Sequence, residues 1–506
     1  MHQGLRWIIG VLLLTLAAAC ARGEPGAPGS MQNEGDVVAI TLLHLNDVYE
    51  LTPVSGGAEG GLARVATLRK QLRKQNPNTY TILAGDLLNP SALSTATVDD
   101  RRLSGRQMVD VMNVLGLDYA TFGNHEFDLK QEELTQRLGE SKFTWFSSNV
   151  ADANAQPLPK IPPNVVFTVK NEAGKQARIG LFGVTVNSNP ATYITYRDPV
   201  EAAKEQVGAL RDKVDVLIAV THLNLEGDIQ LVQQVPEIDV VVGGHEHENA
   251  QVWRGQDFTP ILKADANARA VYVHHLRYDT KTKKLETEAN LKRVTAEIPD
   301  DLEVAKAVDR WVKAAFAGFK AQGFDPEHVV TKTTEALDGR EASVRNFPTR
   351  LTELVATGMV RAAPGTELAV FNAGSIRIDD VLPPGEVTEY DIIRTLPFGG
   401  IVLSAEIKGS LLQKVLDQGK ANAGTGGYLQ SANVTRSPEG NQWLINGGAL
   451  DPARSYQVAI NDFLVSGREI KLGFLTRDNP AVSKIADHGD IRKALISELQ
   501  KTYGAR

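Results

Sequence analysis

Short runs of β-branched residues alternate with amphipathic segments from residue 36 to about residue 278, and this alternation limits the folds open to the chain. Runs of about four to eight such residues, bounded by Gly, Asn and Asp, indicate buried strands. Segments between them, such as 60–75 and 198–213, carry the polar stripe of a surface helix. The pattern predicts an α/β layered domain. The runs are VVAITLLHL, TYTILAG, YATFG, RIGLFGVTV, VDVLIAVTH and IDVVVGG.

A second α/β unit follows a single long helical segment. Residues 300–322 have helical spacing, with acidic residues first and basic residues later, which suits the helix dipole. Because 506 residues exceed the ~250–300 at which single cores stop growing, two domains are expected. The predicted divisions are a signal peptide (1–20), a tether (21–35), a first domain (36–299), a helical connector (300–325) and a second domain (326–506).

The composition is that of an ordinary globular protein, with 42% hydrophobic and 23% charged residues. The net charge of −7 is spread along the chain, so no basic groove for nucleic acid is expected. We expect a small-molecule partner and a monomer.

The N-terminus has the features of an export signal. Arg6 precedes an apolar run that ends in three alanines and Cys20. The run is shorter than the ~20 residues of a membrane-spanning helix. Cys20 is the only cysteine, and its position resembles the lipidated cysteine of bacterial lipoproteins, which implies a periplasmic or outer-membrane lipoprotein. Ordinary signal cleavage after Ala19 is the alternative.

Residues that can bind metal stand at the ends of five predicted strands of the first domain. Such ends gather binding sites in α/β sheets because the loops there project side chains into one crevice. Each residue alone also has a structural interpretation, as a turn former, a helix cap or a satisfied histidine. Mixed carboxylate, amide and imidazole donors favour Zn, Mn or Fe over Ca. The residues are Asp47, Asp86, Asn124, His222, His245 and His247.

This order of motifs, with GNHEFD and GGHEH as its most specific pair, resembles the calcineurin-like metallophosphoesterases. More precisely it resembles the bacterial 5′-nucleotidase and 2′,3′-cyclic phosphodiesterase family, which adds a C-terminal nucleotide-binding domain. The resemblance implies a four-layer first domain, a β-sandwich flanked by helices, and a second α/β substrate-binding domain. It covers about residues 37–474.

The resemblance also implies roles for the strand-end residues. Asp86 would bridge two divalent metal ions. Asp47 and His247 would complete the coordination of one ion. The coordination of the other would be completed by Asn124, His222 and His245. His125 and Asp128 resemble the catalytic dyad, and Glu126 and Phe127 would be structural.

Known chemistry supports a hydrolase with such a centre. Two ions ~3.5–4 Å apart acidify a bound water to hydroxide and clamp phosphoryl oxygens. An unligated His125 beside Asp128 would stay cationic and stabilise charge developing on the phosphoryl group. Tyr49 departs from the family, because it stands where a histidine would bind the first metal, and neutral tyrosine is a poor ligand at pH 7.

Motifs of the second domain resemble the family's substrate pocket. In VFNAGSIR, Asn372 and Arg377 would contact substrate, and Phe398 and Phe463 would stack on a nucleobase. Glu469 stands where the family has an Asp for the ribose, and Arg345 or Arg350 is expected to supply a missing positive charge.

Three functions fit these residues. The leading hypothesis is a 5′-nucleotidase outside the cytoplasm. The first alternative is a phosphoesterase for non-nucleotide, cyclic or pyrophosphate substrates, favoured by the altered loop at Glu469. The second is a surface binding lipoprotein with impaired catalysis, favoured by Tyr49 and disfavoured by the retained dyad and ligands.

Overall fold

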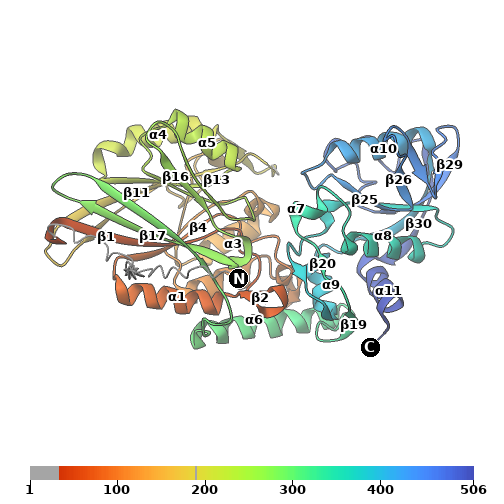
Figure 1. Cartoon of the computed structure of the whole chain (residues 1–506), viewed down its shortest axis with the longest axis horizontal. Helices are drawn as coiled ribbons and strands as arrows, with labels where there is room; N and C mark the ends of the chain where they lie inside the picture. Colours follow the sequence, from red (N-terminus) through yellow and green to blue (C-terminus); the bar gives the residue numbers. More distant parts are fainter. Residues whose placement is uncertain (1–33, 189–190, 506) are drawn as a thin grey trace, which may run out of the picture.

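The computed structural model describes residues 34–188 and 191–505 (Figure 1). The predicted signal peptide and Cys20, together with almost all of the tether, lie outside the described residues. Within these two ranges, none of the helices has the length and apolar character needed to cross a membrane.

The N-terminal part is built on two six-stranded sheets whose central strands are parallel. The first sheet has the order β18 (Leu285–Arg293), β17 (Ala270–Asp279), β1 (Val37–Leu45), β4 (Thr79–Ala84), β7 (Tyr119–Thr121) and β8 (Thr144–Phe146). The second has the order β10 (Asn164–Lys170), β11 (Gln176–Thr185), β13 (Val216–His222), β14 (Val240–Gly243), β16 (Thr259–Lys263) and β15 (Ala250–Arg254).

The two sheets pack face to face, and helices cover both outer faces. Apolar side chains of β1, β4, β11, β13 and β14 form one buried cluster between the sheets. The outer face of the first sheet packs on α1 (Leu62–Gln75), α2 (Arg106–Leu115) and α6 (Leu302–Ala321). The outer face of the second packs on α4 (Pro199–Leu210) and α5 (Leu225–Gln234). Figure 1 shows the resulting order of helix, sheet, sheet and helix, which confirms the predicted four-layer sandwich.

Local sequence explains where these helices begin. The side chain of Asp198 accepts hydrogen bonds from the backbone N–H of Val200 and Glu201, and Pro199 occupies the first turn of α4. In the same way Asp301 caps α6 through the N–H of Val304. Helix α6 then runs along α1 and α2, where the Trp311 indole N–H donates to Asp110 Oδ2 at 2.8 Å. The predicted connecting helix is therefore packed against the N-terminal layers.

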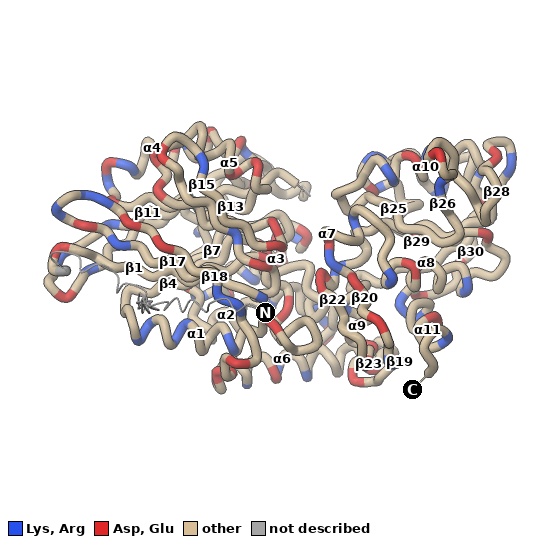
Figure 2. The backbone as a smooth tube through the Cα atoms, in the orientation of Figure 1, with Lys and Arg blue, Asp and Glu red and all other residues tan. Residues whose placement is uncertain are grey.

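The C-terminal part is a second α/β unit with a five-stranded sheet. Its strand order is β25 (Leu429–Ala432), β21 (Leu368–Asn372), β29 (Ser455–Asn461), β24 (Ile401–Lys408) and β30 (Val482–Asp490). Helix α10 (Gly409–Ala421) packs with one apolar cluster of this sheet. Helices α8 (Arg350–Ala362), α9 (Glu389–Thr395) and α11 (Ile491–Tyr503) belong to another. Lys and Arg are interspersed with Asp and Glu over both units (Figure 2).

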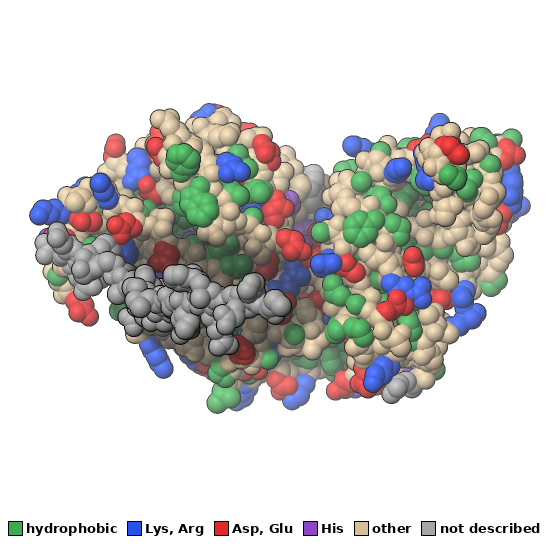
Figure 3. All heavy atoms as spheres, viewed as in Figure 1, with side chains coloured by type: hydrophobic (Ala, Val, Ile, Leu, Met, Phe, Trp, Pro, Cys, Tyr) green, Lys and Arg blue, Asp and Glu red, His purple; other side chains and the backbone are tan. Residues whose placement is uncertain are grey.

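A buried network of charged groups joins the two units. Arg394 of α9 lies with its Nε 3.2 Å from Glu50 Oε1 and its Nη2 3.3 Å from Asp380 Oδ2. The Ser55 hydroxyl donates to the other oxygen of Asp380 at 2.8 Å, and the Tyr390 hydroxyl donates to Glu50 at 3.2 Å. Away from this junction, a hollow separates the two lobes in the space-filling view (Figure 3).

Candidate metal centre and substrate cleft

All six predicted metal-binding residues stand at the carboxyl ends of the parallel strands. Asp47 follows β1, Asp86 follows β4 and Asn124 follows β7 in the first sheet. His222 ends β13, and His245 and His247 follow β14 in the second sheet. The face-to-face packing brings these ends together, because the central strands of the two sheets contribute to one buried cluster.

Three of these side chains form a compact buried group. Ligand atoms of Asp47, Asp86 and His222 all lie within 4.8 Å of one another. His222 Nε2 is 3.3 Å from Asp86 Oδ2 and 3.2 Å from Asn124 Oδ1. Its other ring nitrogen lies 2.8 Å from the carbonyl oxygen of Ala84, which aims Nε2 at the carboxylates.

His245 and His247 lie beside this group. The ring of His245 is 5.1 Å from that of His222, centroid to centroid, and its backbone N–H donates to Asp47 Oδ2 at 2.9 Å. Burial, reinforced by the neighbouring His222, lowers the pKa of His245 to about 3, so the imidazole is neutral as a ligand must be. His247 Nε2 lies 3.5 Å from Asp47 Oδ1.

The backbone of these loops takes conformations that residues other than glycine rarely adopt. Asp47, Asp86 and His245 have φ values of 52°, 56° and 78°. A Cβ on Gly123 would come within 2.0 Å of Asp86 Oδ1, so only glycine leaves room for that carboxylate. Such strained backbone conformations persist only where the surrounding structure imposes them, and they are typical of functional sites.

Tyr49 reaches the middle of this arrangement. Its hydroxyl oxygen lies 3.1 Å from Asp47 Oδ1, 3.0 Å from Asp86 Oδ2 and 3.2 Å from His247 Nε2. Burial, together with the charges of Asp86 and Asp47, raises the pKa of Tyr49 well above its ordinary value, so the phenol is protonated here. The residue that replaces the family histidine thus still contacts the predicted ligands of the first metal.

The donor set fits divalent cations. Asp47 and Asp86 are both buried, and two buried carboxylates this close together need positive charge to offset their desolvation and repulsion. Carboxylate, amide and imidazole donors suit Zn, Mn or Fe.

His125 and Asp128 lie together in a short 3₁₀ turn, His125–Asp128, next to the carboxylates. His125 Nδ1 is 2.7 Å from Asp128 Oδ2, and the Asn89 amide donates to the same oxygen at 2.5 Å. Burial disfavours an ionised Asp128, but the charge and hydrogen bond of His125 outweigh it and lower the pKa of Asp128. The backbone N–H of His125 donates to Asp86 Oδ1 at 2.9 Å, which ties this turn to the predicted metal site.

The Glu126 carboxylate joins the loops that follow β4 and β7. Its carboxylate accepts the backbone N–H groups of Gly123, Asp86, Leu87 and Leu88 at 2.6–3.0 Å. Burial and the nearby Asp86 raise its pKa to about 7. Glu126 therefore fixes the position of Asp86 without pointing at the cleft.

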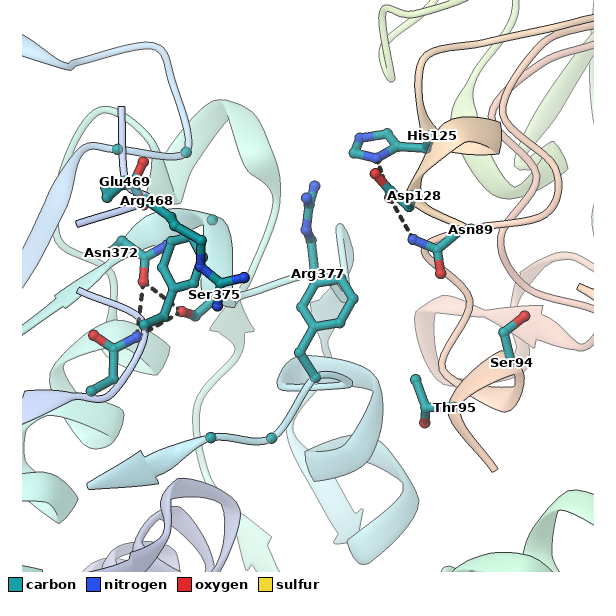
Figure 4. Close-up of a pocket in the computed structure, with 18 of the residues that line it drawn as sticks. Asn89, Ser94, Thr95, His125, Asp128, Asn372, Ser375, Arg377, Arg468 and Glu469 are labelled. Carbon is teal, nitrogen blue, oxygen red and sulfur yellow. Dashed lines mark hydrogen bonds and ion pairs between the residues drawn. The ribbon is translucent and has the colours of Figure 1, made fainter. Parts of the chain in front are cut away.

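A cleft of about 1060 Å³ lies between the two units, and the dyad forms part of its wall. His125 and Asp128 face Arg377 across it (Figure 4). All five residues predicted to bind substrate line this cleft with the dyad: Asn372, Arg377, Phe398, Phe463 and Glu469.

Polar contacts and arginines organise the C-terminal wall. Asn372 Oδ1 accepts from the Ser375 hydroxyl at 2.7 Å and from the Asn461 amide at 2.9 Å. The guanidinium of Arg377 lies 5.7 Å from the ring centre of Phe398, and that of Arg468 lies 5.5 Å from that of Phe463. Burial raises the pKa of Glu469.

The sequence left both Arg345 and Arg350 as candidates for the missing positive charge of the substrate pocket, and the structure distinguishes between them. Arg345 lines the cleft. Arg350 Nε instead lies 3.1 Å from Glu335 and 3.2 Å from the Tyr503 hydroxyl. Sequence reasoning also missed Asn89, which holds Asp128, although it stands in the same GDLLNPS stretch as Asp86.

Comparisons with known proteins agree with this architecture. Residues 40–249 match the family model for calcineurin-like phosphoesterases, and residues 329–472 match the model for the 5′-nucleotidase C-terminal domain. The protein UshA of Yersinia enterocolitica is 27% identical over 90% of this chain and 90% of its own length. The trifunctional nucleotide phosphoesterase YfkN of Bacillus subtilis is 25% identical over 85% of this chain, which spans 32% of YfkN.

Among solved structures, the 5′-nucleotidase precursor of Thermus thermophilus has a similar fold, with a TM-score of 0.75 at 24% identity. The match covers 92% of this chain and 97% of the Thermus chain. The chain thus belongs to the hydrolase family that joins a calcineurin-like phosphoesterase domain to a 5′-nucleotidase C-terminal domain.

Proposed function

We propose that the chain is an extracytoplasmic hydrolase that releases phosphate from nucleotides at a centre of two divalent metal ions. The observation that carries this proposal is the cleft itself. Its one wall bears the His125–Asp128 pair, hydrogen-bonded to Asp86, and its other wall bears the residues expected to grip a nucleotide.

The ligand assignment is the one that the family resemblance implies, and the contacts of Asp86 and His222 support it. Asp47, Asp86 and His247 would hold one ion, and Asp86, Asn124, His222 and His245 would hold the other. When bound, such ions supply positive charge and an acidified water for phosphoester hydrolysis. Asp86 suits the shared position because it contacts both His222 and the Tyr49 hydroxyl beside His247.

His125 would act on the substrate from the edge of the cleft. Its Nδ1 is held by Asp128, which leaves Nε2 to donate a hydrogen bond to a phosphoryl or leaving oxygen. Asp128 and Asn89 keep the ring in that orientation. The pair would thus stabilise charge that grows in the transition state.

Phe398 and Phe463 would hold the base, with Asn372 and Arg377 contacting the rest of the substrate. Aromatic stacking on a base contributes about 1–3 kcal/mol and tolerates different bases. Arg345 would add positive charge for phosphate. The proposed domain limits are 36–299 and 326–506, with 300–325 between them and a lipid anchor at Cys20.

A non-nucleotide, cyclic or pyrophosphate substrate is the second candidate, and one observation favours it. Guanidinium groups already cover a face of each ring, so a base would have to share or displace them. Charged groups on both rings would equally suit a substrate with more than one anionic group.

Phosphate release tests the proposal. The purified chain beginning after Cys20 would be assayed on nucleoside monophosphates, a 2′,3′-cyclic nucleotide, a UDP-sugar and an aryl phosphate, with Mn²⁺, Zn²⁺ or Mg²⁺. Asp86→Ala is the inactive variant, and Asp309→Ala, an exposed acid on α6, is its matched control.

Nucleotide turnover well above that of the aryl phosphate, lost only in Asp86→Ala, supports the nucleotidase. Turnover of the aryl phosphate alone would keep a phosphoesterase but reject the nucleotide pocket. No turnover with any metal would reject hydrolysis and leave the surface binding lipoprotein.

A further inference from the structure

Two carboxylates of the C-terminal unit lie against His247, a predicted metal ligand of the N-terminal unit. Asp379 Oδ2 is 2.9 Å from His247 Nδ1, and Glu341 Oε2 is 3.7 Å from the same nitrogen. The opposite ring nitrogen, Nε2, faces Asp47 Oδ1 at 3.5 Å. The imidazole therefore spans the junction, with one nitrogen toward the metal site and the other toward the C-terminal unit.

Asp379 is held in place from several directions. Its Oδ1 accepts the backbone N–H of Glu341 at 2.8 Å, at the start of α7 (Glu341–Val344). Its backbone has a φ of 40°, which is unusual for a residue with a side chain. Arg269 donates to the backbone carbonyls of both His247, at 3.0 Å, and Asp379, at 3.4 Å. The buried carboxylate is thus aimed at His247 by its surroundings.

We propose that Asp379 is a positioning residue for His247, so that the first metal site is complete only when the two units are docked as they are here. The proposal rests on the proposed function, because it needs His247 to bind a metal ion. A ligating histidine is usually oriented by a carboxylate or carbonyl at its other ring nitrogen, and that partner raises its basicity. In this chain the partner belongs to the other domain.

The same carboxylates extend the connection into the cleft. Glu341 pairs with Arg345, and Arg377 Nη1 lies 3.3 Å from Glu341 Oε1. His247 is therefore linked through Glu341 and Asp379 to two arginines that line the cleft. Because such coupling is reciprocal, metal at the first site should favour the docked arrangement, and the docked arrangement should favour the metal.

Metal titration of the full soluble chain tests this. Metal-free protein beginning after Cys20 would be titrated calorimetrically with Mn²⁺ or Zn²⁺, as wild type, Asp379→Asn, Asp379→Glu and the surface control Asp309→Asn. Asp379→Asn is expected to weaken one of the two binding steps about 10–100-fold and to leave the other unchanged. Asp379→Glu, which keeps the charge, should recover part of that loss.

A distance measurement reads the reciprocal effect. Spin labels on Ala209→Cys of α4 and Gln413→Cys of α10, both exposed, would report the separation of the two units with and without metal. Metal should narrow the distance distribution in the wild-type background and do so less with Asp379→Asn.

The outcomes separate the two proposals. Wild-type protein that binds no metal overturns the proposed function, and this inference with it. Two equally tight binding steps in wild type and Asp379→Asn overturn the inference alone. Equal weakening by Asp379→Asn and Asp379→Glu also overturns it, because that result would reflect lost packing and not the carboxylate.

Discussion

The loops that carry the predicted metal ligands and the C-terminal wall of the cleft are built in different ways. Among the predicted ligands, Asp86 and His222 are 1% and 0% exposed, and Asp47, Asp86 and His245 have positive φ values. On the opposite wall Phe398 is 51% exposed, and the guanidinium of Arg377 lies 5.7 Å from the centre of its ring. The predicted metal ligands are thus positioned by buried loops with unusual backbone conformations, whereas the ring predicted to stack on a base is half-exposed.

The first prediction concerns His125, whose backbone N–H donates to Asp86 and whose side chain lines the cleft. His125→Ala should lower kcat about 10²–10³-fold, the usual cost of losing one donor to a developing charge, with little change in metal content. Steady-state kinetics with nucleoside monophosphate and elemental analysis of the variant would measure this. A variant that keeps its kcat would show that the dyad does not act on substrate.

A matched pair of glycines sharpens the difference in rigidity. Gly123→Ala would place a Cβ 2.0 Å from Asp86 Oδ1. The affinity for metal should therefore fall about 10–100-fold. A Cβ in Gly426→Ala, on the cleft wall, would meet only backbone atoms of Gly374, the Cα at 3.2 Å and the N at 3.7 Å. The metal affinity of this variant should match wild type, with a few-fold change in KM. Equal effects at the two positions would remove the distinction between the regions.

The smallest effect is expected at the exposed ring. Phe398→Leu should raise KM for nucleotides about tenfold, within the ~1–3 kcal/mol of base stacking, and leave kcat unchanged. An aryl phosphate or a ribose phosphate without a base provides the control substrate for the same variant. If KM for ribose phosphate rises as much as KM for the nucleotide, Phe398 does not recognise the base.

Sequence patterns predicted strands β1, β4, β7, β11, β13 and β14 and the strand ends that carry the candidate ligands, but not the outer strands of the two sheets. This worked because strand periodicity is local and parallel strands deliver their carboxyl ends to one edge. The candidate ligands in the loops after β1, β4 and β7, for example, could be predicted without reference to the C-terminal unit.

Contacts between the units could not be predicted in this way. Asp379 and Glu341 meet His247 only through the docking of two domains, and no periodicity encodes that placement. The sequence left the choice between Arg345 and Arg350 open for a related reason. The two arginines are five positions apart, and the direction of each depends on the short helix α7 and the turn that follows it.

Metal content is the decisive test of whether this chain hydrolyses nucleotides at a centre of two metal ions. The chain beginning after Cys20 would be stripped with a chelator, reloaded with Mn²⁺ or Zn²⁺, and measured by elemental analysis alongside nucleotide turnover. We expect about two ions per chain, with turnover that is lost on stripping and returns as the second ion binds. No bound ion, or full turnover in the stripped protein, would contradict it.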